Sequence, residues 1–204
     1  MARVLSSDPS TGRRRSDSSR SAILAATREV LEEIGFNKLS IEGVAARAGV
    51  GKATIYRWWP TKGVLAVEAF LEGVAPAISF PKTKSAQADV AAQVRKLSKL
   101  YRGKVGQIVC EMIGSGQCDT EMKTVFFDGY LKPRREAAKE VFQRGIDQGE
   151  FREGLDLDTL VDAVYGPIFY RMLTGYAAID DRFIEDVLDM AFRGISVNDG
   201  RPTS

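Results

Sequence analysis

The sequence contains no histidine, and this absence excludes several classes of enzyme. A Ser-His-Asp triad, a Cys-His nucleophile pair, a histidine general base and a HExxH zinc site each require an imidazole. Chemistry based on carboxylates or lysines stays open, but no arrangement of these residues indicates it. We therefore expect no catalytic residues and a protein that is not an enzyme.

Cysteine is also scarce, with Cys110 and Cys118 as the two examples. Two cysteines are too few for a disulfide framework, and without histidine they make a poor metal site. No GxGxxG or GxxxxGK[ST] phosphate-binding loop occurs in the chain. We therefore expect neither a metal nor a cofactor.

Long apolar runs are missing as well. No stretch approaches the ~20 apolar residues of a membrane-spanning helix, so no membrane contact is expected. The basic N-terminus lacks the apolar segment of a secretory signal. With 44% hydrophobic and 27% charged residues, the 204-residue chain has the composition of a soluble globular protein, and the cytoplasm is its expected location.

Basic residues are concentrated in the first part of the chain. Residues 1–62 hold 11 Lys and Arg against 6 Asp and Glu, a balance of +5, whereas residues 63–204 hold 18 against 21, a balance of −3. This asymmetry suggests that the first part meets a polyanion. Arg13, Arg14 and Arg15 lie in a Ser- and Arg-rich segment, residues 1–18, that is predicted to be disordered. These arginines could enter a DNA minor groove, but a plain tail is the simpler interpretation.

Hydrophobic spacing predicts helices throughout and no strand, so the expected fold class is all-α. Residues 19–66 should hold three short helices and the start of a fourth. Their start and stop signals are Ser18 or Ser19, Gly35, Ser40, Gly49, Gly51, Pro60 and Thr61. The third helix should run to about Trp58.

A tight turn at Gly49 separates the second and third predicted helices, which is typical of a helix-turn-helix DNA-binding domain. The residues expected to face inward are Val44, Val50, Ile55 and one or both of Trp58 and Trp59. Those left pointing outward are Lys52, Ala53, Thr54, Tyr56 and Arg57.

Residues 67–197 are predicted to form a helical ligand-binding and dimerisation domain, followed by a disordered tail at residues 198–204. The segment 157–173 is apolar on almost every side, which favours burial on all sides, most naturally in a homodimer. The residues expected at the dimer interface are Val164, Ile168, Arg171, Phe183, Val187 and Met190.

The stretch from Ala22 to Phe70 resembles the tetracycline-repressor (TetR) family of transcriptional regulators. The matching positions are Gly35-Phe36, Ser40, Ile41, Ala45, Ala48-Gly49-Val50, Thr54, Tyr56, Trp59, Lys62 and Leu65. Gly51 and Gly63 depart from the pattern, since the family often has Ser or Thr at the first and Glu at the second. The resemblance implies a homodimeric repressor of a palindromic double-stranded DNA operator.

The third helix would then lie in the major groove. Lys52 and Arg57 are candidates for base or phosphate contacts, and the resemblance implies phosphate contacts for Thr54, Tyr56 and Lys62. The full predicted DNA-binding set is Ser40, Lys52, Ala53, Thr54, Tyr56, Arg57 and Lys62.

Aromatic and methionine side chains of the second domain are candidates for an effector pocket. They are Phe70, Met112, Phe126, Phe127, Tyr130, Tyr165, Phe169 and Met172. Such a lining would suit a small, largely apolar molecule whose binding releases DNA. The alternative hypothesis is a helical ligand-binding protein or an enzyme without specific DNA binding.

Overall fold

The computed structural model describes residues 9–196, and the predicted all-α fold is confirmed. The helices are α1 (Pro9–Lys38), α2 (Ile41–Ala48), α3 (Lys52–Tyr56), α4 (Lys62–Val74), a 3-10 turn η1 (Ala75–Ala77), α5 (Ala86–Tyr101), α6 (Lys104–Cys118), α7 (Thr120–Phe126), a π-helical turn η2 (Phe127–Leu131), α8 (Lys132–Asp147), α9 (Leu157–Thr174) and α10 (Asp181–Ile195). In the described part, strand-like pairing is limited to one isolated bridge, Phe151 with Ser196.

The first helix is longer than the sequence pattern predicts. Residues 9–18, which we expected to be disordered, form the first turns of α1. A helix that is already nucleated extends at little cost, and proline is well suited to the first helical position, which Pro9 occupies. The remaining residues of the two predicted tails, 1–8 and 198–204, lie outside the described part of the chain.

Gly35 interrupts α1, as its sequence context predicts. Its backbone has φ 81° and ψ 178°, a conformation that residues with a side chain rarely adopt. A Cβ atom at this position would also lie 2.5 Å from Oε2 of Glu111 on α6. The helix resumes for one short turn to Lys38, so Gly35 is a kink that lies directly against the second domain.

Local signals set the ends of the next helices as predicted. The Ser40 hydroxyl accepts a hydrogen bond from the Gly43 N–H at 3.1 Å, and Gly49 ends α2 in the left-handed conformation. Thr61 caps α4 by accepting from the Val64 N–H at 3.4 Å. The third helix is shorter than expected and ends at Tyr56, two residues before Trp58.

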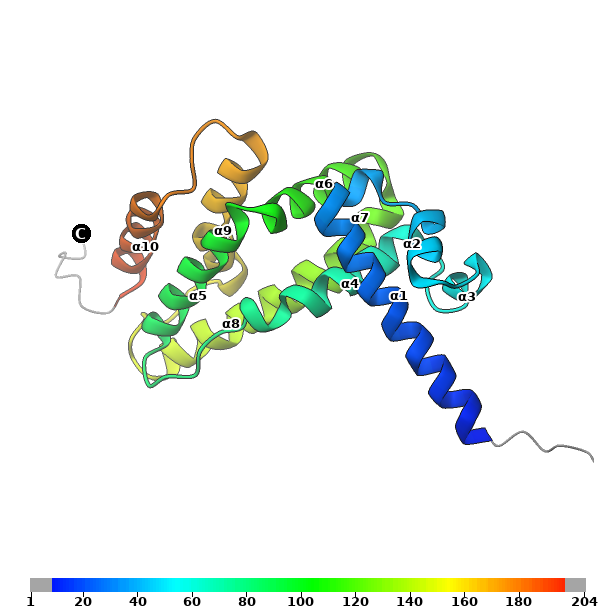
Figure 1. Cartoon of the computed structure of the whole chain (residues 1–204). Helices are drawn as coiled ribbons and strands as arrows, with labels where there is room; N and C mark the ends of the chain where they lie inside the picture. Colours follow the sequence, from blue (N-terminus) through cyan, green and yellow to red (C-terminus); the bar gives the residue numbers. More distant parts are fainter. Residues whose placement is uncertain (1–8, 197–204) are drawn as a thin grey trace, which may run out of the picture.

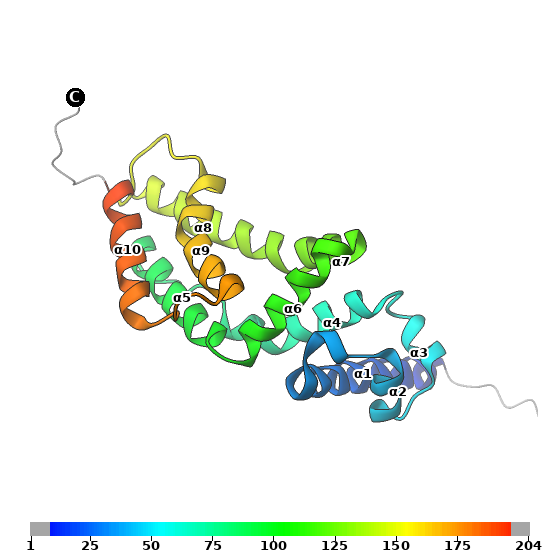
Figure 2. The same cartoon turned by 90° about the horizontal axis from the view of Figure 1, so that it is seen from above.

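Two ends of the molecule are clearly separated in Figures 1 and 2. The helix-turn-helix elements α2 and α3 lie at one end, and α10 lies at the other. Between them, α7 packs against both α4 and α6, and α6 also packs against α1. α7 passes through the π-helical turn η2 into α8, and Pro133 stands in the first turn of α8, where the missing N–H of a proline is tolerated.

Candidate DNA-binding and effector sites

The short helix α3 lies at one end of the molecule (Figure 1), and its outward side, with Arg57 just after it, forms a polar ridge. Lys52, Ala53 and Arg57 are exposed, Tyr56 is 51% exposed, and Thr54 is half-buried. Ile55 is fully buried and fixes the opposite side of the helix in the core. The structure therefore places outside the residues of this helix that were predicted to point outward, and places Ile55 inside, as predicted.

Backbone hydrogen bonds hold α3 at a fixed angle to α2. The Val50 N–H donates to the Ala45 carbonyl at 3.0 Å across the glycine turn, and the Trp59 N–H donates to the Ile55 carbonyl at 3.0 Å. A helix this short would not persist alone in water. Its conformation therefore depends on the turn before it and on the burial of Trp59 after it.

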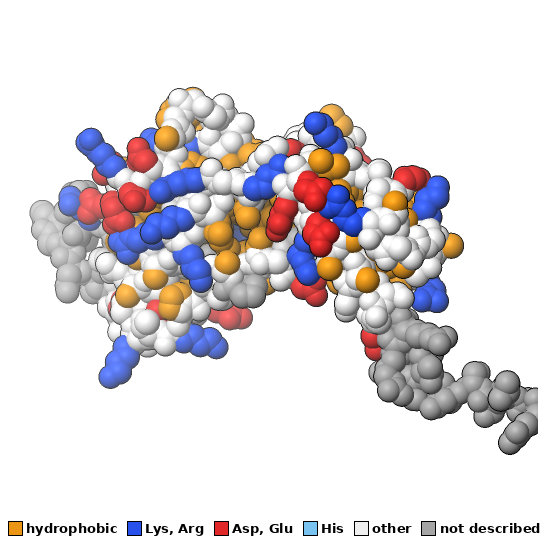
Figure 3. All heavy atoms as spheres, in the orientation of Figure 1, with side chains coloured by type: hydrophobic (Ala, Val, Ile, Leu, Met, Phe, Trp, Pro, Cys, Tyr) orange, Lys and Arg blue, Asp and Glu red, His pale blue; other side chains and the backbone are white. Residues whose placement is uncertain are grey.

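The two basic side chains on this ridge have different surroundings. Lys52 Nζ lies 3.0 Å from Glu42 Oε1, and this hydrogen bond raises the pKa of Lys52 and lowers the pKa of Glu42. The pair is exposed, so water and phosphate compete with it readily. The Arg57 guanidinium lies over the Trp58 ring at 5.6 Å. Blue side chains project from this end of the surface in Figure 3.

Ser40 and Lys62 also differ in what they can offer to DNA. The Ser40 hydroxyl is exposed and uses an acceptor site for its cap, so its proton is still available to donate. The half-buried Lys62 ammonium instead donates to the Phe36 carbonyl at 3.3 Å and lies 4.5 Å from the Phe36 ring. Burial lowers the pKa of Lys62, and the charge of Glu111 opposes this. Lys62 is therefore turned toward the α1 kink and not toward the ridge.

A polar network behind the ridge was not predicted from the sequence. Trp59 Nε1–H donates to Glu68 Oε2 at 2.7 Å, and Arg20 pairs with the other oxygen of Glu68. The Arg20 guanidinium also lies over both the Trp58 and Trp59 rings. The three partners come from α1, α4 and the segment after α3, and no local sequence signal links them.

The second domain contains a cavity of about 430 Å³ bounded by α5, α6, α7, α8, α9 and η2. Six of the eight predicted pocket residues line it: Met112, Phe126, Phe127, Tyr130, Tyr165 and Phe169. The prediction is wrong for Phe70, which does not line the cavity. It is buried behind Tyr130, with 5.5 Å between the ring centroids. The prediction is also wrong for Met172, which lies beside Cys110 at a separate surface depression.

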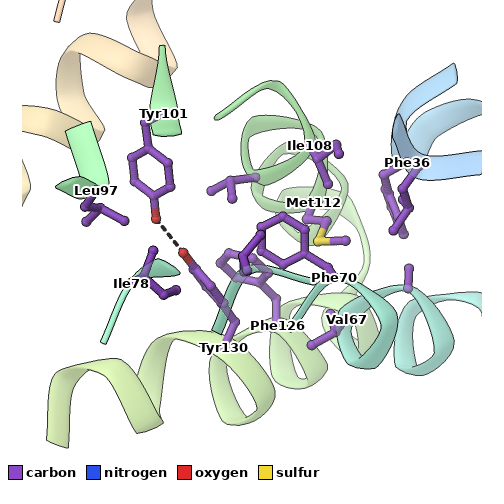
Figure 4. Close-up of a cluster of buried hydrophobic side chains, with 14 of the residues drawn as sticks. Phe36, Val67, Phe70, Ile78, Leu97, Tyr101, Ile108, Met112, Phe126 and Tyr130 are labelled. Carbon is purple, nitrogen blue, oxygen red and sulfur yellow. Dashed lines mark hydrogen bonds between the residues drawn. The ribbon is translucent and has the colours of Figure 1, made fainter. Parts of the chain in front are cut away.

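The polar groups of the cavity come mainly from residues that sequence reasoning missed. Tyr101 and Tyr130 join their hydroxyls at 2.6 Å, as the dashed line in Figure 4 shows. The Tyr165 hydroxyl donates to Gln93 Oε1 at 2.7 Å. Arg134 also lines the cavity wall. Most of the remaining lining is apolar, so the cavity suits an apolar molecule with a few polar atoms.

Family models account for both halves of this architecture. One described as "Bacterial regulatory proteins, tetR family" matches residues 23–69, and one described as "Tetracyclin repressor-like, C-terminal domain" matches residues 80–191. The chain belongs to the TetR family of transcriptional regulators. The resemblance seen in the sequence and the predicted DNA-binding function are thereby confirmed.

Individual relatives of this TetR-family protein agree. An uncharacterised HTH-type transcriptional regulator of Bacillus subtilis, YdeS, is 35% identical over 90% of this chain and 93% of its own length. The crystal structure of the TetR-family regulator SCO0332 has a TM-score of 0.79 at 33% identity and covers 86% of this chain and 97% of its own. These relatives are regulators and not enzymes, and they do not favour the alternative hypothesis.

A more distant structure shares the fold. It is the regulator FadR of Bacillus subtilis in complex with stearoyl-CoA, with a TM-score of 0.66 at 22% identity, covering 86% of this chain and 98% of that one. Regulators of this family bind DNA operators and act as dimers with small-molecule effectors.

In this TetR-family chain, no helix within residues 9–196 is long and apolar enough to cross a membrane.

Half of the dimer-interface residues predicted for this TetR-family regulator need correction. Val164, Ile168 and Val187 are buried inside the single chain, so they are core residues and cannot reach a partner. Phe183 and Arg171 are half-buried, with the Arg171 guanidinium 3.5 Å from the Phe183 ring centroid. Met190 is 67% exposed. Three large apolar side chains at the end of α9 and just after it are also exposed: Tyr170, Leu173 and Tyr176.

Proposed function

We propose that this regulator is a homodimeric repressor that leaves a pseudo-palindromic operator when a small, largely apolar effector enters the cavity. The supporting observation is that one helix, α6, both lines the cavity and packs against α1 of the DNA-binding half. Its Met112 lines the cavity, while the adjacent Glu111 accepts a hydrogen bond from the Asn37 N–H at 3.0 Å, just beyond the α1 kink. Because bacterial operators are chromosomal, we infer that the protein acts in the cytoplasm.

In this proposal α3 lies in the major groove. Tyr56 and Thr54 would donate to backbone phosphates, and Lys52 and Arg57 would contact bases or phosphates. Ala53 is exposed and small enough to allow close approach to the groove. Ser40 would add a phosphate contact at the start of α2. Lys62 would contact phosphate after release from the Phe36 carbonyl, so we assign it a secondary role.

The route from cavity to DNA would run through packed side chains. Figure 4 shows Phe70 and Met112 between the tyrosine pair and Phe36, which belongs to α1. Phe70, Met112 and Phe36 are all buried, so the space between the cavity and the kink is filled. An effector that fits a different arrangement of these groups would favour a conformation in which the two DNA-binding domains of the dimer are displaced. DNA affinity would then fall by the ratio of the effector's affinities for the two states.

The support for a dimer is a group of exposed apolar side chains at the C-terminal end of α9 and in the segment after it, away from α3. They are Tyr170, Leu173 and Tyr176, with exposures of 61%, 48% and 64%, and Met190 on α10 is also exposed, at 67%. The Tyr170 and Tyr176 rings also contact each other, with centroids 5.5 Å apart. A second copy would cover these side chains and place two α3 helices on the same duplex.

We expect Leu173→Asp to convert the protein to a monomer. A carboxylate at this position would have to be buried without a partner in the dimer, which is strongly unfavourable. Sedimentation equilibrium measures the change in mass directly. Ile34→Asp is the matched control, because Ile34 is equally exposed at 44% but lies in the DNA-binding half. A dimeric Leu173→Asp variant would contradict the proposed interface.

The DNA-binding proposal is tested by titrating the purified protein against its own upstream DNA at several salt concentrations. Site-selective binding that weakens as salt rises is expected, since phosphate contacts release counterions. Equal affinity for any duplex would contradict an operator-specific repressor.

Tyr56→Phe should weaken binding roughly 10- to 100-fold per subunit for all sequences, because a charge-assisted hydrogen bond to phosphate contributes about 1.5–3 kcal/mol. The side chain is half exposed, so the thermal unfolding midpoint should not change. Operator titration and thermal unfolding of the same preparation measure both. Unchanged affinity would remove Tyr56 from the interface.

A further inference from the structure

Of the two arginines on the cavity wall, one forms ion pairs with carboxylates and the other does not. Arg135 pairs with Asp162, and also with Asp158 at 2.9 Å. Arg134 is half-buried and contacts the Ile78 carbonyl, with its Nη1 at a long distance of 3.5 Å. Within residues 9–196, no carboxylate pairs with Arg134. The wall therefore holds a guanidinium that makes no ion pair within the described residues.

The tyrosine pair leaves one hydroxyl proton unused. Tyr101 and Tyr130 are both buried, and a single hydrogen bond of 2.6 Å joins their oxygens. Only one of their two protons lies in that bond, so the accepting hydroxyl can donate its own proton into the cavity. Burial raises the pKa of both phenols, and the nearby charge of Arg134 opposes part of this. Both groups stay protonated at neutral pH and act as donors.

The other buried polar groups of the cavity are already engaged with each other. The Tyr165 hydroxyl donates to Gln93 Oε1, and Gln93 Nε2 donates to the Ile78 carbonyl at 3.3 Å. This chain of bonds holds the backbone carbonyl that Arg134 also contacts. Among the buried and half-buried side chains of the wall, the donors left for a ligand are therefore the Arg134 guanidinium and one phenol proton. Lys123 also lines the cavity, but its side chain is exposed to solvent.

We propose that the effector is an apolar carboxylate, whose acid group accepts hydrogen bonds from Arg134 and from the tyrosine pair. Its hydrocarbon body would lie against the apolar wall formed by Phe126, Val161 and Phe169. The proposal rests on the effector role of the cavity and adds the chemical class of the ligand. A guanidinium in an apolar wall needs hydrogen-bond acceptors and a negative charge beside it. A carboxylate supplies both, with two acceptor oxygens and the opposite charge.

A neutral ligand fits these donors less well. An alcohol or an ester can accept a hydrogen bond but leaves the guanidinium charge without a partner at a site that has lost water. An apolar amine would bring a second positive charge beside Arg134. The cavity should therefore rank ligands with the same hydrocarbon body in the order carboxylate, alcohol, amine.

The test uses matched probes that share one hydrocarbon body: decanoate, decanol and decylamine, and 4-phenylbutanoate with 4-phenylbutanol. Calorimetry on the full-length protein should give a dissociation constant for each carboxylate at least tenfold lower than for its alcohol. Arg134→Gln should abolish this preference while leaving alcohol binding unchanged. Lys132→Gln, which removes the same charge from the same helix outside the cavity, should retain the preference.

The remaining outcomes separate the ligand class from the repressor function. Equal affinity for acids and alcohols, or a preference that survives Arg134→Gln, would overturn the carboxylate proposal. Failure of every carboxylate to bind would overturn it as well. Selective binding of carboxylates that leaves operator affinity unchanged would support the ligand class and contradict the effector role.

Discussion

Trp59→Ala is expected to abolish DNA binding by unfolding the helix-turn-helix. Trp59 is 1% exposed, and its indole N–H bonds to Glu68. Replacing a buried tryptophan by alanine costs about 3–5 kcal/mol. The α3 helix has five residues and no side-chain cap at Gly51, so it has few other sources of stability. Urea unfolding followed by circular dichroism, together with operator titration, measures both losses.

The neighbouring tryptophan provides a matched control. Trp58 is 37% exposed and lies 6.4 Å from Trp59 between ring centroids. Trp58→Ala should cost less than about 1 kcal/mol, because most surface substitutions have small effects. Trp59→Phe keeps most of the apolar volume and removes the bond to Glu68, so an intermediate loss is expected. A Trp58→Ala variant as unstable as Trp59→Ala would contradict this assignment of the core residue.

The DNA-binding half could be predicted closely because its signals are local. Ser40 and Thr61 stand at their caps, and Gly35 and Gly49 adopt the positive φ values that their positions require. Each of these signals depends on residues within four positions along the chain. The orientation of Lys62 could not be predicted in this way, because its partner Phe36 lies 26 residues away.

The dimer prediction failed in part for a related reason. Segment 157–173 is apolar on nearly every side, and such a pattern does not tell which face meets the core and which meets a partner. The structure buries Val164 and Ile168 within the chain and exposes Tyr170 and Leu173 toward the end of α9. The buried positions 160, 161, 164 and 168 and the exposed positions 162, 163, 166, 170 and 173 alternate with helical spacing, so exposure changes around the helix axis. The prediction assumed instead that this segment is buried on all sides.

The cavity was predicted by residue type, and this identified its apolar lining and two of its tyrosines but not Gln93, Tyr101 or Arg134. Aromatic and methionine residues are natural candidates for any pocket, and six of eight line this one. Gln93, Tyr101 and Arg134 come from α5 and α8, which meet only in the folded chain. No spacing along the sequence indicates that a glutamine and an arginine 41 positions apart share one cavity.

The same limitation applies to the buried ion pair that joins α5 to α8. Asp89 is 0% exposed, and its Oδ2 lies 2.5 Å from Arg144 Nη2, 55 residues away. The Thr83 N–H and hydroxyl donate to the same carboxylate at 3.1 and 2.7 Å. An aspartate on a predicted amphipathic helix is normally assigned to the solvent side. Its burial with these partners makes it a support for the wall of the cavity domain.

Asp89→Asn should lower the free energy of unfolding by about 2–3 kcal/mol at pH 7. Breaking a fully buried pair costs about 3–5 kcal/mol, and the Arg144 side chain, which is 31% exposed, can recover some hydration. Asp189→Asn is the matched control, because it removes the same charge from an exposed pair with Arg193. A solvent-exposed pair contributes about 0–1 kcal/mol, so this control should stay close to wild type. Urea unfolding of both variants measures the difference.

The pH dependence of the stability lost in Asp89→Asn shows whether the loss comes from the missing ion pair or from disturbed packing. Burial raises the pKa of Asp89, but the hydrogen bonds from Arg144 and Thr83 outweigh it, so the folded pKa lies below the ordinary value of 3.8. A carboxylate with a lowered pKa contributes its full stability above pH 3.8 and loses it as the pH falls through the folded pKa. The gap between wild type and Asp89→Asn should therefore shrink as the pH falls below about 3.8. A gap of constant size would mean that the asparagine disturbs packing and that the ion pair contributes little.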